Sequence, residues 1–272
     1  MLEKHLNCGI LTVEVKFHNN PNFKQEKKMN IKIYETKTDM SREAAMYGAG
    51  ILRKTILDKG YANVIFATAP SQFEMMSFLI QEPDIDWSKV TIFHLDEYIH
   101  LPADHIAGFR LNLRKNLIDQ LPQQPAKVYF VDGDNPETFC ADMKKIMSGL
   151  VIDLAFIGVG ENGHLAFNDP PADFDTDESY KIVALDEVCR NQQYTEGWFP
   201  TLDAVPTNAL TMSIPQILKS RAIVNVVPDA RKAEAIKGMV EGPLTNLCPA
   251  SVLRNHPNCV TFLDKAAASL LK

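Results

Sequence analysis

The sequence predicts one α/β domain, Rossmann-like and doubly wound, with a mainly parallel sheet covered by helices on both faces. Three observations support this fold class. Short apolar runs of strand length alternate with segments of helical periodicity, as expected for strands buried by crossover helices. No Gly/Ser-rich or Pro-rich linker and no internal repeat divides the chain. At 272 residues, the chain is long enough to bury a large core as a single domain.

The first half of the chain shows this alternation in order. Residues 31–34 alternate apolar and polar side chains, which predicts a short strand. Thr38 or Asp39 can cap the helix that follows, over 42–58. Residues 64–67 form a continuous apolar run typical of a buried strand. The same criteria then predict a helix over 72–79, a strand over 90–95, a helix over 109–118 and a strand over 127–131.

The second half repeats the pattern with a helix over 137–146, strands over 152–157 and 222–227, a helix over 230–240 and a last strand over 259–263. In sheets of this kind ligands bind beyond the carboxyl ends of the strands. Polar residues directly after a strand are therefore the candidates for function.

Composition narrows the class of protein. The chain has 28 Lys+Arg against 34 Asp+Glu, 46% hydrophobic and 23% charged residues, and a net charge of −6. This composition is typical of a globular protein, and its mild acidity argues against nucleic acid as a partner. The cysteines are odd in number, scattered along the chain and contain no C-x-x-C pair, which argues against a disulfide framework or a Cys-rich zinc site. Free cysteines of this kind indicate the reducing cytoplasm. These residues are Cys8, Cys140, Cys189, Cys248 and Cys259.

The first 30 residues differ from the rest of the chain. They are polar, end in a charged run at 24–28, and lack the apolar core of a secretory signal. No apolar run in the chain approaches the roughly 20 residues needed to span a bilayer, so no membrane partner is expected. We predict a loosely ordered N-terminal extension over 1–30 and a folded domain over 31–272.

Two adjacent carboxylates, Asp96 and Glu97, directly follow the strand predicted over 90–95. Burying a carboxylate costs folding free energy, so two carboxylates at a strand end are expected either to be solvated or to have a function. If the strand continues, the two side chains project to opposite sides and need not share a role. Spacing alone favours a solvated strand end or a helix cap over a catalytic pair.

A glycine loop over 158–171 follows the strand at 152–157. It contains the pattern G-x-G-x-x-G, and Asp186 lies at roughly the distance of the acid in a dinucleotide-binding fingerprint. That fingerprint requires a helix at its third glycine. Two prolines and an acidic stretch over 173–178 fill the interval instead, so no nicotinamide cofactor is expected.

The glycine loop presents a histidine, His164, flanked by Asn162 and Asp169. An imidazole can accept and donate a proton near neutral pH when a neighbour fixes its tautomer. A single histidine is more often structural, but Gly160 and Gly163 allow close backbone approach and favour a site. The other nearby histidines show no H-x-x-x-H spacing, so metal ligation is not expected.

Two segments have the features of anion sites. Residues 68–71, which include Thr68 and Ser71, lie between a strand and a helix. There, backbone N–H groups and hydroxyls can bind an anion. Residues 228–232 repeat this arrangement and add Arg231 and Lys232. Together with a proton-transfer histidine, they indicate a phosphorylated small substrate.

At these residues the sequence resembles the glucosamine-6-phosphate deaminase/isomerase family, within a wider group that includes 6-phosphogluconolactonases. The resemblance covers about 31–263, and its most specific parts are FHLDEY at 93–98, the loop at 158–170, and EG at 241–242 followed by SVLRNHP at 251–257. It implies a Rossmann-like fold and conversion of glucosamine 6-phosphate, or a close hexosamine 6-phosphate, to the ketose phosphate and ammonia.

The resemblance also implies roles for individual residues. Asp96 falls on the base that moves a proton between C2 and C1, and His164 on the histidine that opens the sugar ring. Asp169 and Asn162 fall where the deaminases carry a supporting glutamate and an aspartate. Lys232 falls on a phosphate-binding lysine. The remaining residues expected to bind substrate are Thr68, Ser71, Glu97, Gly160, Gly163 and Arg190, the last as a second phosphate cation.

Several residues depart from the family pattern. Ala69 and Pro70 replace glycines of the phosphate loop, which reduces its backbone freedom. Asn162 cannot carry a negative charge, so it would stabilise an imidazolium less than aspartate does. The acidic region after Pro171 does not match the effector-binding segment of allosteric deaminases, so allosteric regulation is not implied.

Two alternatives to the deaminase remain. A lactonase would hydrolyse a sugar lactone, although His164-Leu165-Ala166-Phe167-Asn168 is the deaminase version of the loop. A non-catalytic sugar-phosphate sensor is the other, although the polar extension is too short for a helix-turn-helix output module. The sequence does not specify the hexosamine epimer or whether the chain forms a homo-oligomer.

Overall fold

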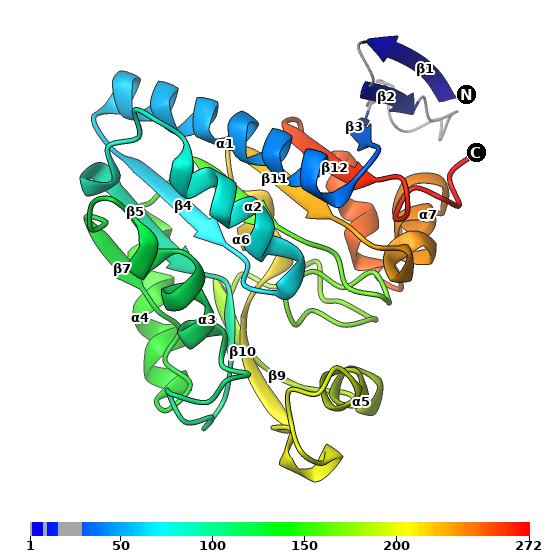
Figure 1. Ribbon diagram of the computed structural model, residues 1–272. Coiled ribbons are helices and arrows are strands. Elements are labelled where there is room, and N and C mark those ends of the chain that lie inside the picture. The colour runs from blue at the N-terminus through cyan, green and yellow to red at the C-terminus, as the bar shows by residue number, and fades with distance from the viewer. Residues whose placement is uncertain (1, 8–9, 16–28) are drawn as a thin grey trace.

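The computed structural model describes residues 2–7, 10–15 and 29–272, and its centre is a long twisted sheet between layers of helices (Figure 1). In the described chain, parallel pairings join neighbouring strands from β3 to β7. Their order is β3 (Met29–Tyr34), β12 (Cys259–Asp264), β11 (Ala222–Val227), β8 (Leu154–Ile157), β4 (Ala62–Phe66), β5 (Val90–His94) and β7 (Lys127–Tyr129).

Helices cover both faces of this sheet, which confirms the predicted fold class. One apolar layer includes Phe156 and Phe262 and packs under α1 (Lys37–Lys59), α2 (Pro70–Gln81) and α3 (Phe109–Asn116). The opposite layer packs under α4 (Pro136–Ser148), α6 (Ile214–Leu218) and α7 (Ala233–Glu241). The inner strands β4, β8, β11 and β12 are thus buried along their whole length, as their continuous apolar runs predicted.

Two helix starts differ from the sequence prediction for a local reason. The cap of α1 is Thr36, whose hydroxyl accepts from the Asp39 backbone N–H at 3.1 Å, so this helix begins before the predicted 42. The helix expected over 230–240 is preceded by a 3₁₀ turn, η4 (Ala230–Lys232), capped by Asp229. The α-helix proper therefore starts at Ala233.

Within the first 30 residues the structure describes two strands, β1 (Leu2–Asn7) and β2 (Ile10–Val15). They pair antiparallel with each other, and β2 pairs antiparallel with β3. In the structure these two segments thus extend the central sheet beyond β3. Residues 1, 8–9 and 16–28 lie outside the described residues, and the loosely ordered extension over 1–30 stays a prediction.

A second, antiparallel sheet was not predicted. It consists of β6 (Asp96–Tyr98), β10 (Asn208–Met212) and β9 (Tyr180–Ala184), in that order. With α5 (Glu187–Thr195) it extends away from the central sheet (Figure 1). The aromatic rings of Tyr98, Phe167 and Phe199 form its small core.

The topology places two strand ends side by side at the centre of the sheet. From β4 the chain continues outward through β5 to β7, and from β8 it continues in the opposite direction through β11 to β12. The neighbours β4 and β8 are therefore the switch point, beyond which ligands bind in such sheets. No helix in the described part of the chain is both long enough and apolar enough to cross a membrane.

Candidate active site at the switch point

A cleft opens beyond the carboxyl ends of β4, β5, β8 and β11, as the position of the switch point predicts. Its walls include the segment after β4, the glycine loop after β8, η4 after β11, and the chain from α5 to Trp198. Six of the residues predicted from the sequence line it: Thr68, Ser71, Asp96, Gly160, His164 and Lys232.

Asp96 and Glu97 face opposite directions, as expected if the strand continues. At Leu95 the chain leaves the central sheet, and Asp96 then pairs with Thr211 in the small sheet. The Asp96 side chain lines the cleft although the residue is only 5% exposed. Its pKa is raised well above the ordinary value, by burial first and by the nearby charge of Glu97 second. A carboxylate with a raised pKa is a stronger base than one in water.

Glu97 does not line the cleft. Its carboxylate accepts backbone hydrogen bonds from Phe109 at 3.2 Å and Arg110 at 2.6 Å, at the N-terminus of α3. It also accepts one from Tyr98 at 2.9 Å. Glu97 therefore satisfies free N–H groups at a helix start, which is a structural role, and it is not a member of the proposed substrate site.

The glycine loop holds the ring of His164 flat against backbone. A Cβ atom on Gly160 would lie 2.2–2.4 Å from three atoms of the imidazole, so only glycine leaves room for the ring there. Gly163 has a φ of +84°, in the left-handed region that favours glycine. The loop is fixed from outside by β10, because the Phe167 N–H donates to Thr211 at 3.1 Å and the Asn168 amide donates to the carbonyl of Met212 at 2.9 Å.

Asp169 and Asn162 lie behind the histidine. The Nδ1 atom of His164 is 3.0 Å from Oδ1 of Asp169, which is ion-pair distance for a protonated ring. The Asn162 amide donates to the same oxygen at 2.9 Å, and its carbonyl accepts the His164 backbone N–H at 3.0 Å. Burial acts to raise the pKa of Asp169, but its contacts with His164 and Asn162 outweigh burial and lower it. Asp169 therefore supplies charge, while Asn162 fixes the positions of both neighbours.

An anion site lies at the N-terminus of α2. The cap residue, Ala69, gives this helix no side-chain hydrogen bond. Pro70 has no N–H and the Gln72 N–H donates to the Ala69 carbonyl at 2.8 Å, so Ser71 carries the first helix N–H that can face the cleft. The Thr68 hydroxyl, in a residue only 3% exposed, has no hydrogen-bond partner among the described residues. The N-terminal dipole, Thr68 and the Ser71 hydroxyl together suit a phosphate group.

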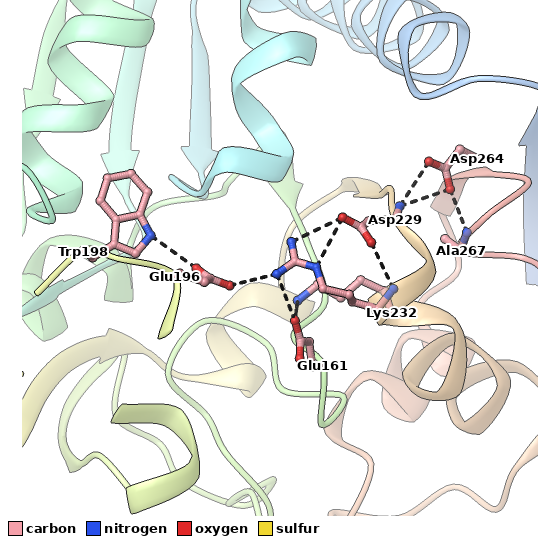
Figure 2. Close-up of polar contacts among 8 residues, drawn as sticks. Glu161, Glu196, Trp198, Asp229, Lys232, Asp264 and Ala267 are labelled. Carbon is pink, nitrogen blue, oxygen red and sulfur yellow. Dashed lines mark hydrogen bonds and ion pairs between the residues drawn. The ribbon is translucent and has the colours of Figure 1, made fainter. Parts of the chain in front are cut away.

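Arg231 and Lys232 enter the cleft from η4. Asp229, at the start of η4, is held in place by Asp264. Both carboxylate oxygens of Asp264 lie 3.1 Å from the Asp229 backbone nitrogen and accept its N–H (Figure 2). These contacts support a φ of +89° at Asp229, a conformation costly for a residue other than glycine. Burial lowers the pKa of Lys232, whereas the nearby charge of Glu161 acts to raise it.

Arg190 does not reach the cleft. Its guanidinium donates to the backbone carbonyls of Leu202, at 2.8 Å, and Val205, at 3.1 and 3.3 Å. These bonds tie α5 to the chain that leads into β10. The expected second phosphate cation is therefore not Arg190. Within the described residues, no group of three or more His, Cys, Asp or Glu side chains is arranged to hold a metal ion.

The cleft also contains residues that the sequence predictions left out. Gln193, Glu196 and Trp198 form one wall, on α5 and the turn after it. Their segment follows no strand of the central sheet, so a search restricted to strand ends passes over them. Arg231, which belongs with Lys232 to the anion segment predicted over 228–232, also lines the cleft.

Comparison with known proteins shows the family of the chain. The family model for glucosamine-6-phosphate isomerases/6-phosphogluconolactonase matches residues 35–262, most of the chain. The chain belongs to this family. Among its curated members, glucosamine-6-phosphate deaminase of Lacticaseibacillus paracasei is 32% identical over 243 residues, covering 89% of this chain and 99% of the relative. The Bacillus cytotoxicus protein of the same name is 32% identical and covers 89% of each chain.

Solved structures of the family have the same fold. A monomeric glucosamine-6-phosphate deaminase superposes with a TM-score of 0.80 at 28% identity, covering 88% of this chain and 99% of that one. The 6-phosphogluconolactonase of Thermotoga maritima has a TM-score of 0.71 at 18% identity, covering 86% and 99%. The second likeness concerns the fold alone, since members of one fold can differ in their reaction.

Proposed function

We propose that the protein converts glucosamine 6-phosphate, or a close hexosamine 6-phosphate, to the corresponding ketose 6-phosphate and ammonia. One observation carries this proposal: the buried base Asp96 and the imidazole of His164 open onto one cleft that also contains an anion site. The relatives named glucosamine-6-phosphate deaminase at 32% identity support it. The cysteines described in the structure are free thiols, which fits a cytoplasmic enzyme of amino-sugar metabolism.

The substrate phosphate would bind at the N-terminus of α2, between the Thr68 and Ser71 hydroxyls and the ammonium group of Lys232. This places the sugar over the glycine loop and directs its C1–C2 end toward Asp96 and His164. The aromatic side chains of Phe109, Phe167 and Trp198, which also line the cleft, would limit access of water to the sugar.

In the proposed mechanism His164 first opens the pyranose ring by moving a proton between the anomeric hydroxyl and the ring oxygen. The nearby charge of Asp169 stabilises the imidazolium formed during this transfer. Asp96 then takes the proton from C2 while the C1 carbonyl oxygen gains a proton, which gives an enolamine. Asp96 returns its proton to C1, and the amino nitrogen gives up a proton, which leaves a hydroxyl on C1 and an imine at C2. Water adds to this imine, and ammonia leaves as the ketone forms.

The decisive experiment is an assay of ammonia release from a panel of hexosamine 6-phosphates and their unphosphorylated forms. We expect release from one or more of the phosphates, with the best epimer identified by kcat/KM. If the protein instead hydrolyses 6-phosphogluconolactone, or binds hexosamine phosphates without turnover, the deaminase proposal is wrong.

Replacing Lys232 with alanine tests the anion site. The contact with the phosphate is present in both the ground and the transition state, so we expect KM to rise about tenfold or more with a smaller change in kcat. The preference for glucosamine 6-phosphate over glucosamine should shrink accordingly. Equal use of the two sugars by the wild-type protein would show that no phosphate is bound here.

Replacing Gly160 with alanine tests whether the glycine loop positions the His164 ring. The added methyl group must displace the His164 ring, because it would lie within 2.4 Å of three ring atoms. We expect kcat to fall at least about tenfold while the protein still folds, since a small error in position is costly for a proton-transfer group. Gly50→Ala is the matched control: no atom lies within 4 Å of the added Cβ, and alanine favours its helix. Unchanged kcat in both variants would contradict the role given to Gly160.

A further inference from the structure

The carboxylate of Glu161 contacts both cations of the cleft. Its Oε1 lies 3.4 Å from Nη1 of Arg231 and 3.9 Å from Nζ of Lys232. Glu161 is part of the glycine loop and stands between Gly160 and Asn162, whereas the two cations belong to η4. The Glu161 carboxylate is thus closer to Arg231, but it also lies within ion-pair distance of Lys232.

Arg231 is already paired with carboxylates, which makes it a weaker partner than Lys232 for an incoming anion. Its guanidinium also contacts Glu196 at 3.3 Å and Asp229 at 3.3 Å. Figure 2 shows these three carboxylates converging from the glycine loop, the turn before Trp198 and the start of η4. Three negative side chains therefore surround two positive ones, and a phosphate arriving at Lys232 adds further negative charge beside Glu161.

The three carboxylates differ in how freely they can move. Asp229 is fixed, because its side chain caps η4 by accepting the Arg231 N–H at 3.0 Å and its own N–H is held by Asp264. Glu196 accepts from the Trp198 indole at 3.2 Å. The Glu161 side chain is 37% exposed and can turn into solvent, whereas that of Lys232 is only 12% exposed. Glu161 is therefore the partner of Lys232 that a phosphate can displace.

We propose that Glu161 is the internal counter-anion of the phosphate site and sets its affinity, because an incoming phosphate must displace the Glu161 carboxylate from Lys232. The inference rests on the proposed function for the location of the phosphate. It assigns a specificity-determining role to a residue outside the proton-transfer groups. Binding replaces the Glu161–Lys232 pair with a phosphate–Lys232 pair, so the gain in binding free energy is smaller than it would be for an unpaired lysine. The ketose phosphate product is released more readily for the same reason.

Direct binding of inorganic phosphate to the full-length protein, measured by calorimetry at pH 8, tests this role without any turnover. We expect Glu161→Gln to bind inorganic phosphate about tenfold more tightly than wild type, since the competing charge is gone. Glu137→Gln is the control for net charge, because Glu137 is exposed on α4 and does not line the cleft. Its affinity should equal that of wild type.

A double variant shows whether the gain acts through Lys232. In the Lys232→Ala background, adding Glu161→Gln should improve phosphate binding less than twofold. Equal or weaker binding by Glu161→Gln than by wild type, a similar gain in Glu137→Gln, or a full tenfold gain in the absence of Lys232 would each overturn the inference. Failure of the proposed function is distinct: it would appear as wild-type protein that releases no ammonia from any hexosamine 6-phosphate.

Discussion

Replacing Asp96 with asparagine is expected to lower turnover at least about a hundredfold while leaving the binding of substrate almost unchanged. The amide has nearly the shape of the carboxylate but cannot take the C2 proton, and general bases contribute about 10²–10⁴ to rate. The measurement is kcat together with the entry of solvent deuterium at C1 of the product. Entry of deuterium at the wild-type rate would show that Asp96 is not the base.

The same variant should make the protein more stable at neutral pH. Burial raises the pKa of Asp96 in the folded state, so the free energy of unfolding falls as the pH rises from the unfolded-state pKa to the folded-state pKa, and the full cost is present above the folded-state pKa. Below the ordinary carboxyl pKa of about 4 the group is protonated in both states and the cost is absent. We therefore expect the Tm of Asp96→Asn to exceed that of wild type at pH 8 and to match it near pH 3. A base held at a cost in stability is common in active sites.

Replacing His164 with glutamine should lower kcat on the cyclic sugar about a hundredfold, because glutamine cannot carry the proton during ring opening. An open-chain analogue needs no ring opening, so the variant should retain relatively more activity on it. Asp96→Asn is the comparison, since it should be impaired equally on both substrates. A loss of the same size on both substrates in His164→Gln would move His164 out of the ring-opening step.

The partners of His164 explain why its role depends on Asp169. The imidazole is 3.0 Å from that carboxylate, whose pKa is lowered by these contacts, so Asp169 is ionised at neutral pH. Asn162 supplies no charge but holds the carboxylate and the loop backbone at once. The departure from aspartate at 162 thus leaves a charged partner beside the ring.

The central sheet could be predicted because its signals are local. Each strand is a short apolar run, and each crossover helix has a face of periodic apolar residues, so the pattern alone specifies the layers. The strand ends at Thr68, Asp96 and Gly158 followed from the same pattern and the rule for switch points. The individual roles of Asp96, His164 and Lys232 come from the resemblance to the family. The comparisons established the family, and the three roles stay predictions.

The small antiparallel sheet could not be predicted in the same way. The strand β6 has only three residues, and its partner β10 lies more than a hundred residues later in the chain. Neither strand has a long apolar run, because β6 begins with two carboxylates and β10 includes Asn208 and Thr211 among its five residues. Its formation turns the chain at Leu95, sends Asp96 into the cleft and sends Glu97 to the N-terminus of α3.

The sequence by itself determined the doubly wound architecture, the family, and the position of the cleft, since these depend on periodicity and on ordered motifs within single segments. Only the tertiary structure decided which charged groups meet there. It removed Glu97 and Arg190 from the cleft, because helix-start N–H groups and free carbonyls hold their side chains. It brought Glu161, Glu196 and Arg231 together from three separate segments. Contacts of this kind join segments that are distant in the sequence. They therefore produce no periodic pattern and no regular spacing from which they could be predicted.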